Sequence, residues 1–212
     1  MKTLQNKFNE MQALYGSSEL NCVYGGGKEE NPKMCLVFMN PTSRNIATSK
    51  TWKGIRFQWL GTKQIWKVLT KCGLFDSELN EQIQKLKSSE WTKEFCEIVY
   101  NEVIKNNLYI TNLAKCTQVD ARYLPENVFR EYEEYLLKEL DIIKPEKVIL
   151  FGNLVSSILL NKNITVSTCR KQMYELKTSK NTFSCYPVFY PVGNGFRNVD
   201  KAIEDIIFIK NK

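Results

Sequence analysis

One residue type is missing from this sequence, and its absence narrows the possible chemistry. None of the 212 residues is a histidine. This excludes Ser-His-Asp hydrolysis, Cys-His proteolysis and zinc catalysis that depends on histidine ligands. Any reaction that the protein catalyses must therefore use amides, carboxylates, hydroxyls or lysine.

Paired cysteines and long apolar runs are also missing. The seven cysteines are odd in number and include no C-x-x-C pair, which argues against a disulfide framework and a zinc ribbon. The apolar runs, such as residues 148–151, are far shorter than the ~20 residues that cross a bilayer, and no signal-peptide pattern opens the chain. We expect one soluble domain over residues 1–212 that is cytoplasmic, associates with the nucleoid and does not bind a membrane.

Positive charge is in modest excess. The chain has 30 Lys and Arg against 23 Asp and Glu, which gives a formal net charge of +7. Such a balance suits an anionic partner such as nucleic acid. A solvated surface rich in lysine gives the same balance, so charge alone does not decide between the two interpretations.

Short apolar runs alternate with helical patterns along the chain. Strands are expected at residues 34–39, 108–110, 147–151 and 187–189. Helices are expected at residues 3–15, 62–72 and 91–104, from Pro125 onward and from Val199 onward. The glycine run 25–27 is expected to form a mobile turn. The alternation implies right-handed crossovers, and hence an α/β fold with three α/β/α layers and a central, mostly parallel four-stranded sheet.

The ends of the expected strands locate a site. Ligands of open parallel sheets bind outside the carboxyl ends of the strands. Asn40 follows the first strand, Asn112 follows the second, and a loop with Asn194 follows the fourth. We therefore expect neutral amides around one crevice. Asparagine is also common in turns, because its side chain bonds to nearby backbone groups, so chance supplies part of this pattern.

The same segments resemble the motifs of a known enzyme family. Residues 37–42 (VFMNPT), 54–57 (GIRF) and 65–69 (IWKVL) resemble the first motif and the following helix of mismatch-specific uracil-DNA glycosylases. Residues 109–116 (YITNLAKC) and 143–152 (IKPEKVILFG) are similar to the thermostable iron–sulfur branch. The order of the motifs is preserved over residues 22–200, so the chain resembles the uracil-DNA glycosylase superfamily.

The resemblance implies roles for two asparagines. Asn40 would hold the attacking water, for which orientation matters more than basicity because cleavage of an N-glycosidic bond is expected to be largely dissociative. The alternative is that Asn40 caps the turn into the next helix. Asn112 would read the base, since its amide matches uracil N3–H and O4, whereas cytosine presents the opposite pattern. The alternative is an asparagine that only satisfies backbone groups at a strand end.

Residues near the first motif are expected to contact the extruded base. Phe57 is the first candidate for stacking under it, Trp52 is the second, and Met39 adjoins Asn40. Ordinary core packing is the alternative for either aromatic residue.

The last motif departs from the family pattern. Tyr190 stands where the family usually has a histidine that donates a hydrogen bond to O2 of the departing uracil. Tyr190, or the backbone amides that follow it, would have to stabilise the leaving group. The same loop is expected to wedge into the DNA, with Arg197 or Lys115 on phosphates. Its residues are Val192, Gly193, Asn194 and Gly195.

No cofactor is expected. The iron–sulfur branch uses four cysteines, but Cys22 has no near partner, and the first cysteine after Cys116 is Cys169. No lysine is placed by a motif as a Schiff-base nucleophile. We expect a metal-free, monomeric, monofunctional glycosylase that acts on DNA containing a deaminated base. The alternative is a catalytically silent binder of nucleic acid or nucleotides on the same fold.

Overall fold

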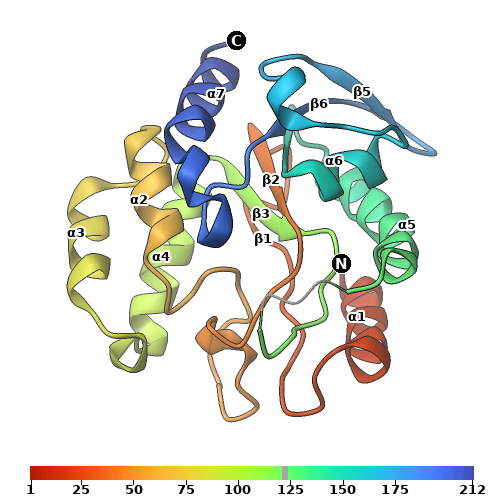
Figure 1. The fold of residues 1–212 in the computed structure, drawn as a ribbon. Coiled ribbons are helices and arrows are strands. Elements are labelled where there is room, and N and C mark those ends of the chain that lie inside the picture. Colours follow the sequence, from red (N-terminus) through yellow and green to blue (C-terminus); the bar gives the residue numbers. More distant parts are fainter. Residues whose placement is uncertain (121–123) are drawn as a thin grey trace.

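A six-stranded sheet forms the middle layer of the protein in a computed structural model that describes residues 1–120 and 124–212 (Figure 1). The strands lie in the order β1-β3-β2-β4-β6-β5. Their bounds are β1 (Gly26–Gly27), β2 (Met34–Phe38), β3 (Leu108–Asn112), β4 (Lys147–Phe151), β5 (Tyr174–Lys177) and β6 (Thr182–Val188). The central strands β3, β2, β4 and β6 are parallel, and β1 and β5 pair antiparallel at the two edges. The predicted fold class is confirmed, with six strands instead of four.

Helices cover both faces of the sheet (Figure 1). One face packs against α2 (Gln64–Lys71), α3 (Ser77–Lys85), α4 (Lys93–Lys105) and α7 (Val199–Asn211). The other face packs against α1 (Lys2–Tyr15), α5 (Glu126–Ile143) and α6 (Asn153–Leu159). None of the helices in the described ranges combines the length and the apolar character that crossing a bilayer needs.

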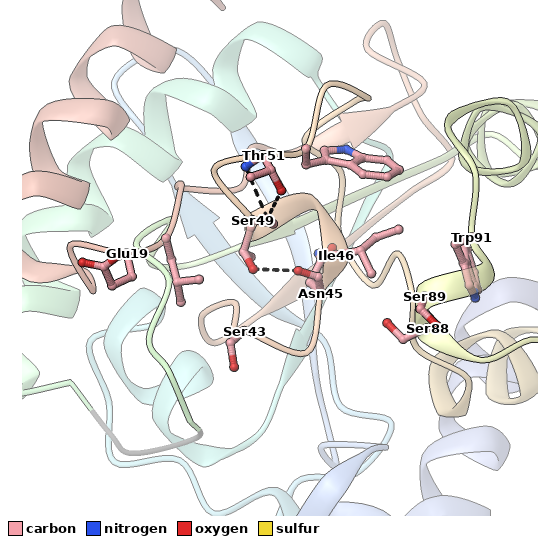
Figure 2. Close-up of a pocket in the computed structure, with 12 residues that line it drawn as sticks. Glu19, Ser43, Asn45, Ile46, Ser49, Thr51, Ser88, Ser89 and Trp91 are labelled. Atoms are coloured by element: carbon pink, nitrogen blue, oxygen red, sulfur yellow. Dashed lines mark hydrogen bonds between the residues drawn. The ribbon is translucent and has the colours of Figure 1, made fainter.

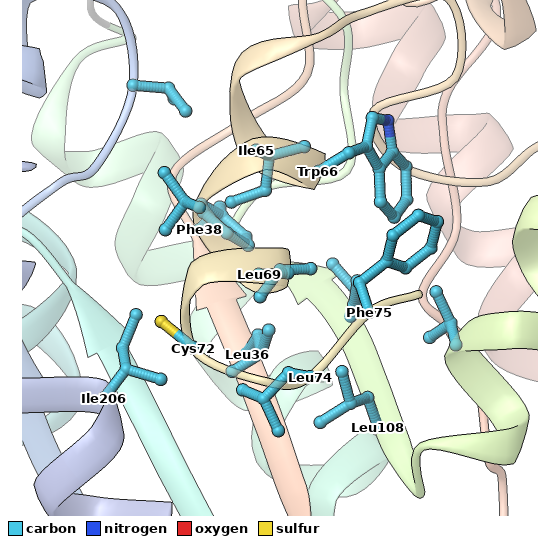
Figure 3. Packing of buried hydrophobic residues seen from close by; sticks show 14 of the residues in the cluster. Leu36, Phe38, Ile65, Trp66, Leu69, Cys72, Leu74, Phe75, Leu108 and Ile206 are labelled. Atoms are coloured by element: carbon cyan, nitrogen blue, oxygen red, sulfur yellow. The ribbon is translucent and has the colours of Figure 1, made fainter. Parts of the chain in front are cut away.

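The central strands are apolar on both sides because both of their faces are covered. In β2, Leu36 and Phe38 join the cluster under α2 and α4, whereas Val37 points to the cluster under α1 and α5. Figure 3 shows the first cluster, where Leu36 and Phe38 lie against Ile65 and Leu69 of α2. A continuous apolar run is the signature of such a strand, which is why β2 and β4 could be read from the sequence.

Two expectations about the strands are corrected. Gly26 and Gly27 form β1 and pair with β3, where a mobile turn was expected. Gly27 has φ +117°, and a Cβ atom there would collide with the carbonyl oxygen of Leu108. Glycine is therefore required at this position for the close approach of β1 to β3. The last parallel strand, β6, begins at Thr182, five residues before the expected start at 187.

The connections change direction at the carboxyl ends of β2 and β4. The chain leaves β2 through α2, α3 and α4 on one face of the sheet, and it leaves β4 through α6 on the other face. Neighbouring parallel strands whose connections run to opposite faces form a topological switch point, where α/β proteins bind their ligands. Asn40 and Gly152 follow these two strands.

Candidate active site

Asn40 lies just beyond the end of β2, and only 6% of it is exposed. Its Nδ2 atom donates to the carbonyl oxygen of Pro41 at 3.2 Å, while its Oδ1 atom is buried without a partner among the described residues. A buried acceptor without a partner is costly, and a water molecule or ligand would satisfy it. The cap of the next helical turn is Asn45, whose Oδ1 accepts from the amide of Ala47 at 2.9 Å.

Asn112 is the last residue of β3 and lies beside Phe38 in the register of the two strands. Only 1% of it is exposed, and neither its Oδ1 nor its Nδ2 atom has a partner within the described ranges. Strand alternation places its side chain on the same face of the sheet as Ile110 and Phe38. Asn112 therefore offers one free donor group and one free acceptor at the carboxyl end of the sheet.

Lys115 is fully buried behind this strand end. Its Nζ atom lies 2.7 Å from Glu139 Oε2 and also donates to the carbonyl oxygen of Asn112. Glu139 accepts further hydrogen bonds from Tyr109 at 2.8 Å and Thr111 at 3.1 Å. The prediction that Lys115 contacts a DNA phosphate is wrong, because its ammonium group is removed from solvent and paired with a carboxylate.

Phe57 lies on the same face of the sheet as Asn112 and is 2% exposed. Its ring meets Tyr100 edge-on, with 4.9 Å between the centroids. Its carbonyl oxygen accepts from Asn45 Nδ2 at 2.8 Å, which ties the Phe57 segment to the loop that follows Asn40. In this state Phe57 is part of the core, at the edge of the site.

The next two residues, Gln58 and Trp59, were missed by the sequence analysis. Gln58 is 2% exposed, and its Nε2 atom is buried. Trp59 has φ +65°, and its ring meets Phe38 edge-on with 4.9 Å between the centroids. In the part of the chain that the structure describes, neither Gln58 Nε2 nor Trp59 Nε1 has a hydrogen-bond partner. No signal in the sequence distinguishes these residues from an ordinary loop.

Tyr190 lies beside the ends of β2 and β4. It follows β6, is half-buried, and meets Phe38 edge-on with 5.9 Å between the ring centroids. Phe38 also stacks on Phe151 of β4, with 4.4 Å between the centroids. Gly152 has φ +88°, and a Cβ atom there would lie 3.7 Å from Tyr190. The structure thus brings Tyr190 to the end of β2, where Asn40 begins the loop.

The carboxyl ends of the parallel strands β2, β3 and β6 thus lie at the same edge of the sheet. The model of the uracil DNA glycosylase superfamily matches residues 25–202. The chain belongs to this superfamily. The match runs from the start of β1 into α7 and includes each strand end described above. It confirms the recognition made from motif order, and it indicates a DNA glycosylase type of function.

The loop after Tyr190 is the segment that was expected to correspond to the superfamily's last motif. Gly193–Asn198 form the 3-10 helix η4. The amide of Gly193 donates to Gln64 Oε1 at 3.0 Å, and the amide of Gly195 donates to the carbonyl oxygen of Val192 at 3.1 Å. These two amides already have partners, so they are not free donors for a leaving group in this conformation.

The side chains of this loop divide into buried and exposed ones. Val192 is 5% exposed and its side chain belongs to the core, so the DNA contact predicted for this residue would have to use its backbone. Asn194 and Arg197 are exposed, as a DNA contact requires. Phe196, which the sequence analysis passed over, is a large apolar side chain of this loop and is 44% exposed.

The two other residues predicted to contact the base, Met39 and Trp52, lie on opposite faces of the sheet. Met39 packs on the cluster under α1 and α5, on the opposite face of the sheet. Trp52 is half-buried, and its Nε1 atom donates to the carbonyl oxygen of Ile55 at 2.9 Å. Trp52 therefore packs on the same cluster as Phe57, whereas Met39 lies on the other face of the sheet.

Trp52 also lines a neighbouring cavity of about 430 Å³. Asn40 and Asn112 are not among its lining residues. Figure 2 shows Ser88, Ser89 and Trp91 on one side of this cavity and Glu19 on the other. Most of the polar groups around it are hydroxyls. The complete lining is Glu19, Leu20, Ser43, Asn45, Ile46, Thr48, Ser49, Thr51, Trp52, Ser88, Ser89 and Trp91.

Metal-binding side chains do not gather anywhere in the described ranges: no group of three or more His, Cys, Asp or Glu is placed to hold an ion. All seven cysteines are buried free thiols. Burial raises the pKa of Cys116 to about 11, so this thiol is neutral at physiological pH. The absence of a cofactor remains a prediction, which iron analysis of the purified protein tests.

Proposed function

We propose that this protein is a monofunctional DNA glycosylase that removes uracil, or another deaminated base, from DNA. The observation that carries the proposal is the pair of buried amides at neighbouring strand ends. Asn40 and Asn112 keep polar atoms without partners among the described residues, although burial makes such atoms costly. A base turned out of the helix and a water molecule beside it would supply the missing hydrogen bonds.

The reaction consumes one water molecule and breaks one bond. The C1′–N bond breaks, and its electron pair leaves with the nitrogen of the base. Asn40 Oδ1 accepts a hydrogen bond from the water, whose oxygen forms the new bond to C1′. The proton that the water loses neutralises the released base through solvent. The products are a free base and an abasic site.

The surroundings of Asn112 support a reaction without strand cleavage. Cleavage through a Schiff base needs an accessible amine as the nucleophile. Lys115, the lysine nearest to Asn112 in the sequence, is fully buried and bound to Glu139. We therefore propose that the abasic site remains in an intact strand, and that alkali is needed to cut it.

Exposed groups on two loops suit a DNA contact. Arg44 follows Asn40 in the loop after β2, and Arg197 lies in η4 after β6; both are exposed. We propose that these two guanidinium groups bind phosphates, in place of Lys115. Phe196 would enter the base stack as an apolar wedge while the damaged base is turned out.

The proposal is tested with an oligonucleotide panel that carries uracil, hypoxanthine or an ordinary base, treated with alkali after incubation. After incubation with wild-type protein, alkali is expected to cut only the strands that carried a deaminated base. Asn40→Ala is expected to lower the single-turnover rate on the order of 100-fold, because the water loses its orientation. Asn163→Ala, in an exposed loop, is the matched control. Binding of the oligonucleotides without any cutting would favour the silent binder instead.

A further inference from the structure

Buried polar atoms without partners are concentrated at one place in this protein. Within residues 1–120 and 124–212, side-chain atoms of this kind occur in Asn40, Gln58, Trp59, Trp91, Asn112 and Tyr132. Asn40 and Asn112 belong to the site described above. Gln58 and Trp59 directly follow Phe57 in the chain, and the rings of Phe57 and Trp59 pack on the same face of the sheet. Because such atoms are rare and costly, their concentration around one strand end indicates a place for a ligand.

The Phe57–Trp59 segment crosses the carboxyl end of β3. At one end, a Cβ atom added to Gly26 would lie 3.0 Å from the Phe57 ring, and Gly26 is in register with Ile110. At the other end, Trp59 packs on Phe38, which is in register with Asn112. Residues 57–59 therefore lie over the face of the sheet to which alternation directs the Asn112 side chain.

The backbone of Trp59 is held in a strained conformation. A bulky residue with φ +65° is disfavoured, and such strain persists only where the surroundings enforce it. Three groups donate to the Trp59 carbonyl oxygen: the Thr62 amide at 3.2 Å, the Thr62 hydroxyl at 2.7 Å and the Trp66 indole at 3.2 Å. Thr62, just before α2, and Trp66 in α2 thus hold the backbone of Trp59 in place.

We infer that Gln58 Nε2 and Trp59 Nε1 donate hydrogen bonds to carbonyl oxygens of the extruded base and stabilise the negative charge that it acquires during cleavage. The inference rests on the proposed glycosylase function. When the C1′–N bond breaks, the electron pair is spread over the base ring and its carbonyl oxygens, where buried N–H donors act most strongly. The chain has no histidine for this task, and the amides of Gly193 and Gly195 are already bonded.

The two donors also define the substrate class. Uracil and hypoxanthine present carbonyl oxygens where cytosine and adenine present amino groups, and an amino group facing a buried N–H donor finds no acceptor. Two fixed donors beside the amide of Asn112 therefore favour bases with carbonyl groups. The pocket would reject the amino bases from which these lesions arise.

The first test removes one donor and keeps the ring. Trp59→Phe retains an aromatic contact with Phe38 but has no N–H group. We expect single-turnover excision of uracil to fall on the order of 100-fold. Excision of 5-fluorouracil should fall much less, because its anion is more stable and needs less help. Trp91→Phe is the matched control, since it also removes a buried indole N–H without a partner in the described ranges, but in the neighbouring cavity.

The second test uses the adjacent residue. Gln58→Leu should reduce uracil excision more than 5-fluorouracil excision, and Gln58→Glu should reduce it further, because a carboxylate opposes the developing charge. A purely structural role would slow both substrates equally. If Trp59→Phe does not fold, as judged by circular dichroism, the Gln58 variants decide the question.

The outcomes separate this inference from the proposed function. Wild-type protein that releases no base from any lesion overturns both. An active wild type overturns the inference alone if the folded Trp59 and Gln58 variants keep the wild-type rate. It also overturns the inference alone if they keep the wild-type ratio between the two substrates.

Discussion

At the scale of single residues, Lys115 and Glu139 form a buried ion pair. The Lys115 side chain is 1% exposed and the Glu139 side chain is 0% exposed. Lys115→Met should lower the free energy of unfolding by about 3–5 kcal/mol, because it leaves a carboxylate buried without its cation. Adding Glu139→Gln should restore much of this loss, since the glutamine oxygen still accepts from Tyr109 and carries no charge. Urea denaturation measures both variants.

The exposed pair Lys138–Glu134 on the same helix provides the control for that experiment. Its side chains are 54% and 66% exposed, so Lys138→Met should cost less than about 1 kcal/mol. A Lys115→Met variant as stable as Lys138→Met would show that the buried pair does not hold the end of β3 in place. A double variant no more stable than Lys115→Met would contradict the role given to the uncompensated charge.

The sequence indicated some residues of the candidate site and not others for a physical reason. Asn40 and Asn112 were found because each directly follows a readable apolar strand, and strand ends meet at a known edge of the sheet. Lys115 was misplaced because its partner, Glu139, comes from a different element of the chain. Gln58 and Trp59 were missed because desolvation and backbone strain arise only once the loop is packed, and neither leaves a local pattern.

At the level of elements, the pairing of β1 with β3 predicts that Gly27 cannot be replaced without a loss of stability. Gly27→Ala should lower the free energy of unfolding by about 3 kcal/mol or more. Two costs add up: the strain of an alanine at positive φ, and the collision of its Cβ atom with the Leu108 carbonyl oxygen. Gly193→Ala is the matched control: it also has positive φ, +57°, but nothing lies within 4 Å of its Cβ. Its cost should be about 1 kcal/mol. Equal thermal denaturation midpoints for the two variants would rule out tight packing of β1 on β3.

Elements were predictable where burial was complete and periodic. β4 was found with its observed bounds, α1 and α4 within two residues at each end, and the start of α5 within one residue, because covered strands are continuously apolar and these helices carry an apolar stripe. β5 was missed because, of its residues YELK, only Leu176 is buried. β1 was missed because glycine offers no side-chain pattern. α6 was missed because it is only seven residues long.

At the scale of the whole molecule, the chain without histidine has no side chain whose ordinary pKa lies between pH 6 and 8. The pKa values of its buried thiols Cys72 and Cys116 lie well above that range. Burial raises the pKa of Cys72 to about 12 and that of Cys116 to about 11, from ordinary values near 9. In the unfolded chain these thiols lose their protons above about pH 9, while in the folded protein they keep them.

The sign of the pH dependence follows from this difference in bound protons. Above pH 9 the folded state holds more protons than the unfolded state, so stability that is present in full below that pH is lost as the pH rises. The free energy of unfolding should be flat from pH 6 to 8 and then fall by up to about 1.4 kcal/mol per pH unit for each such thiol. Urea titrations under reducing conditions from pH 6 to 10 measure it, and Cys72→Ala should make the fall shallower. Stability that stays constant to pH 10, or that changes in a step near pH 6.5, would contradict this account of the core.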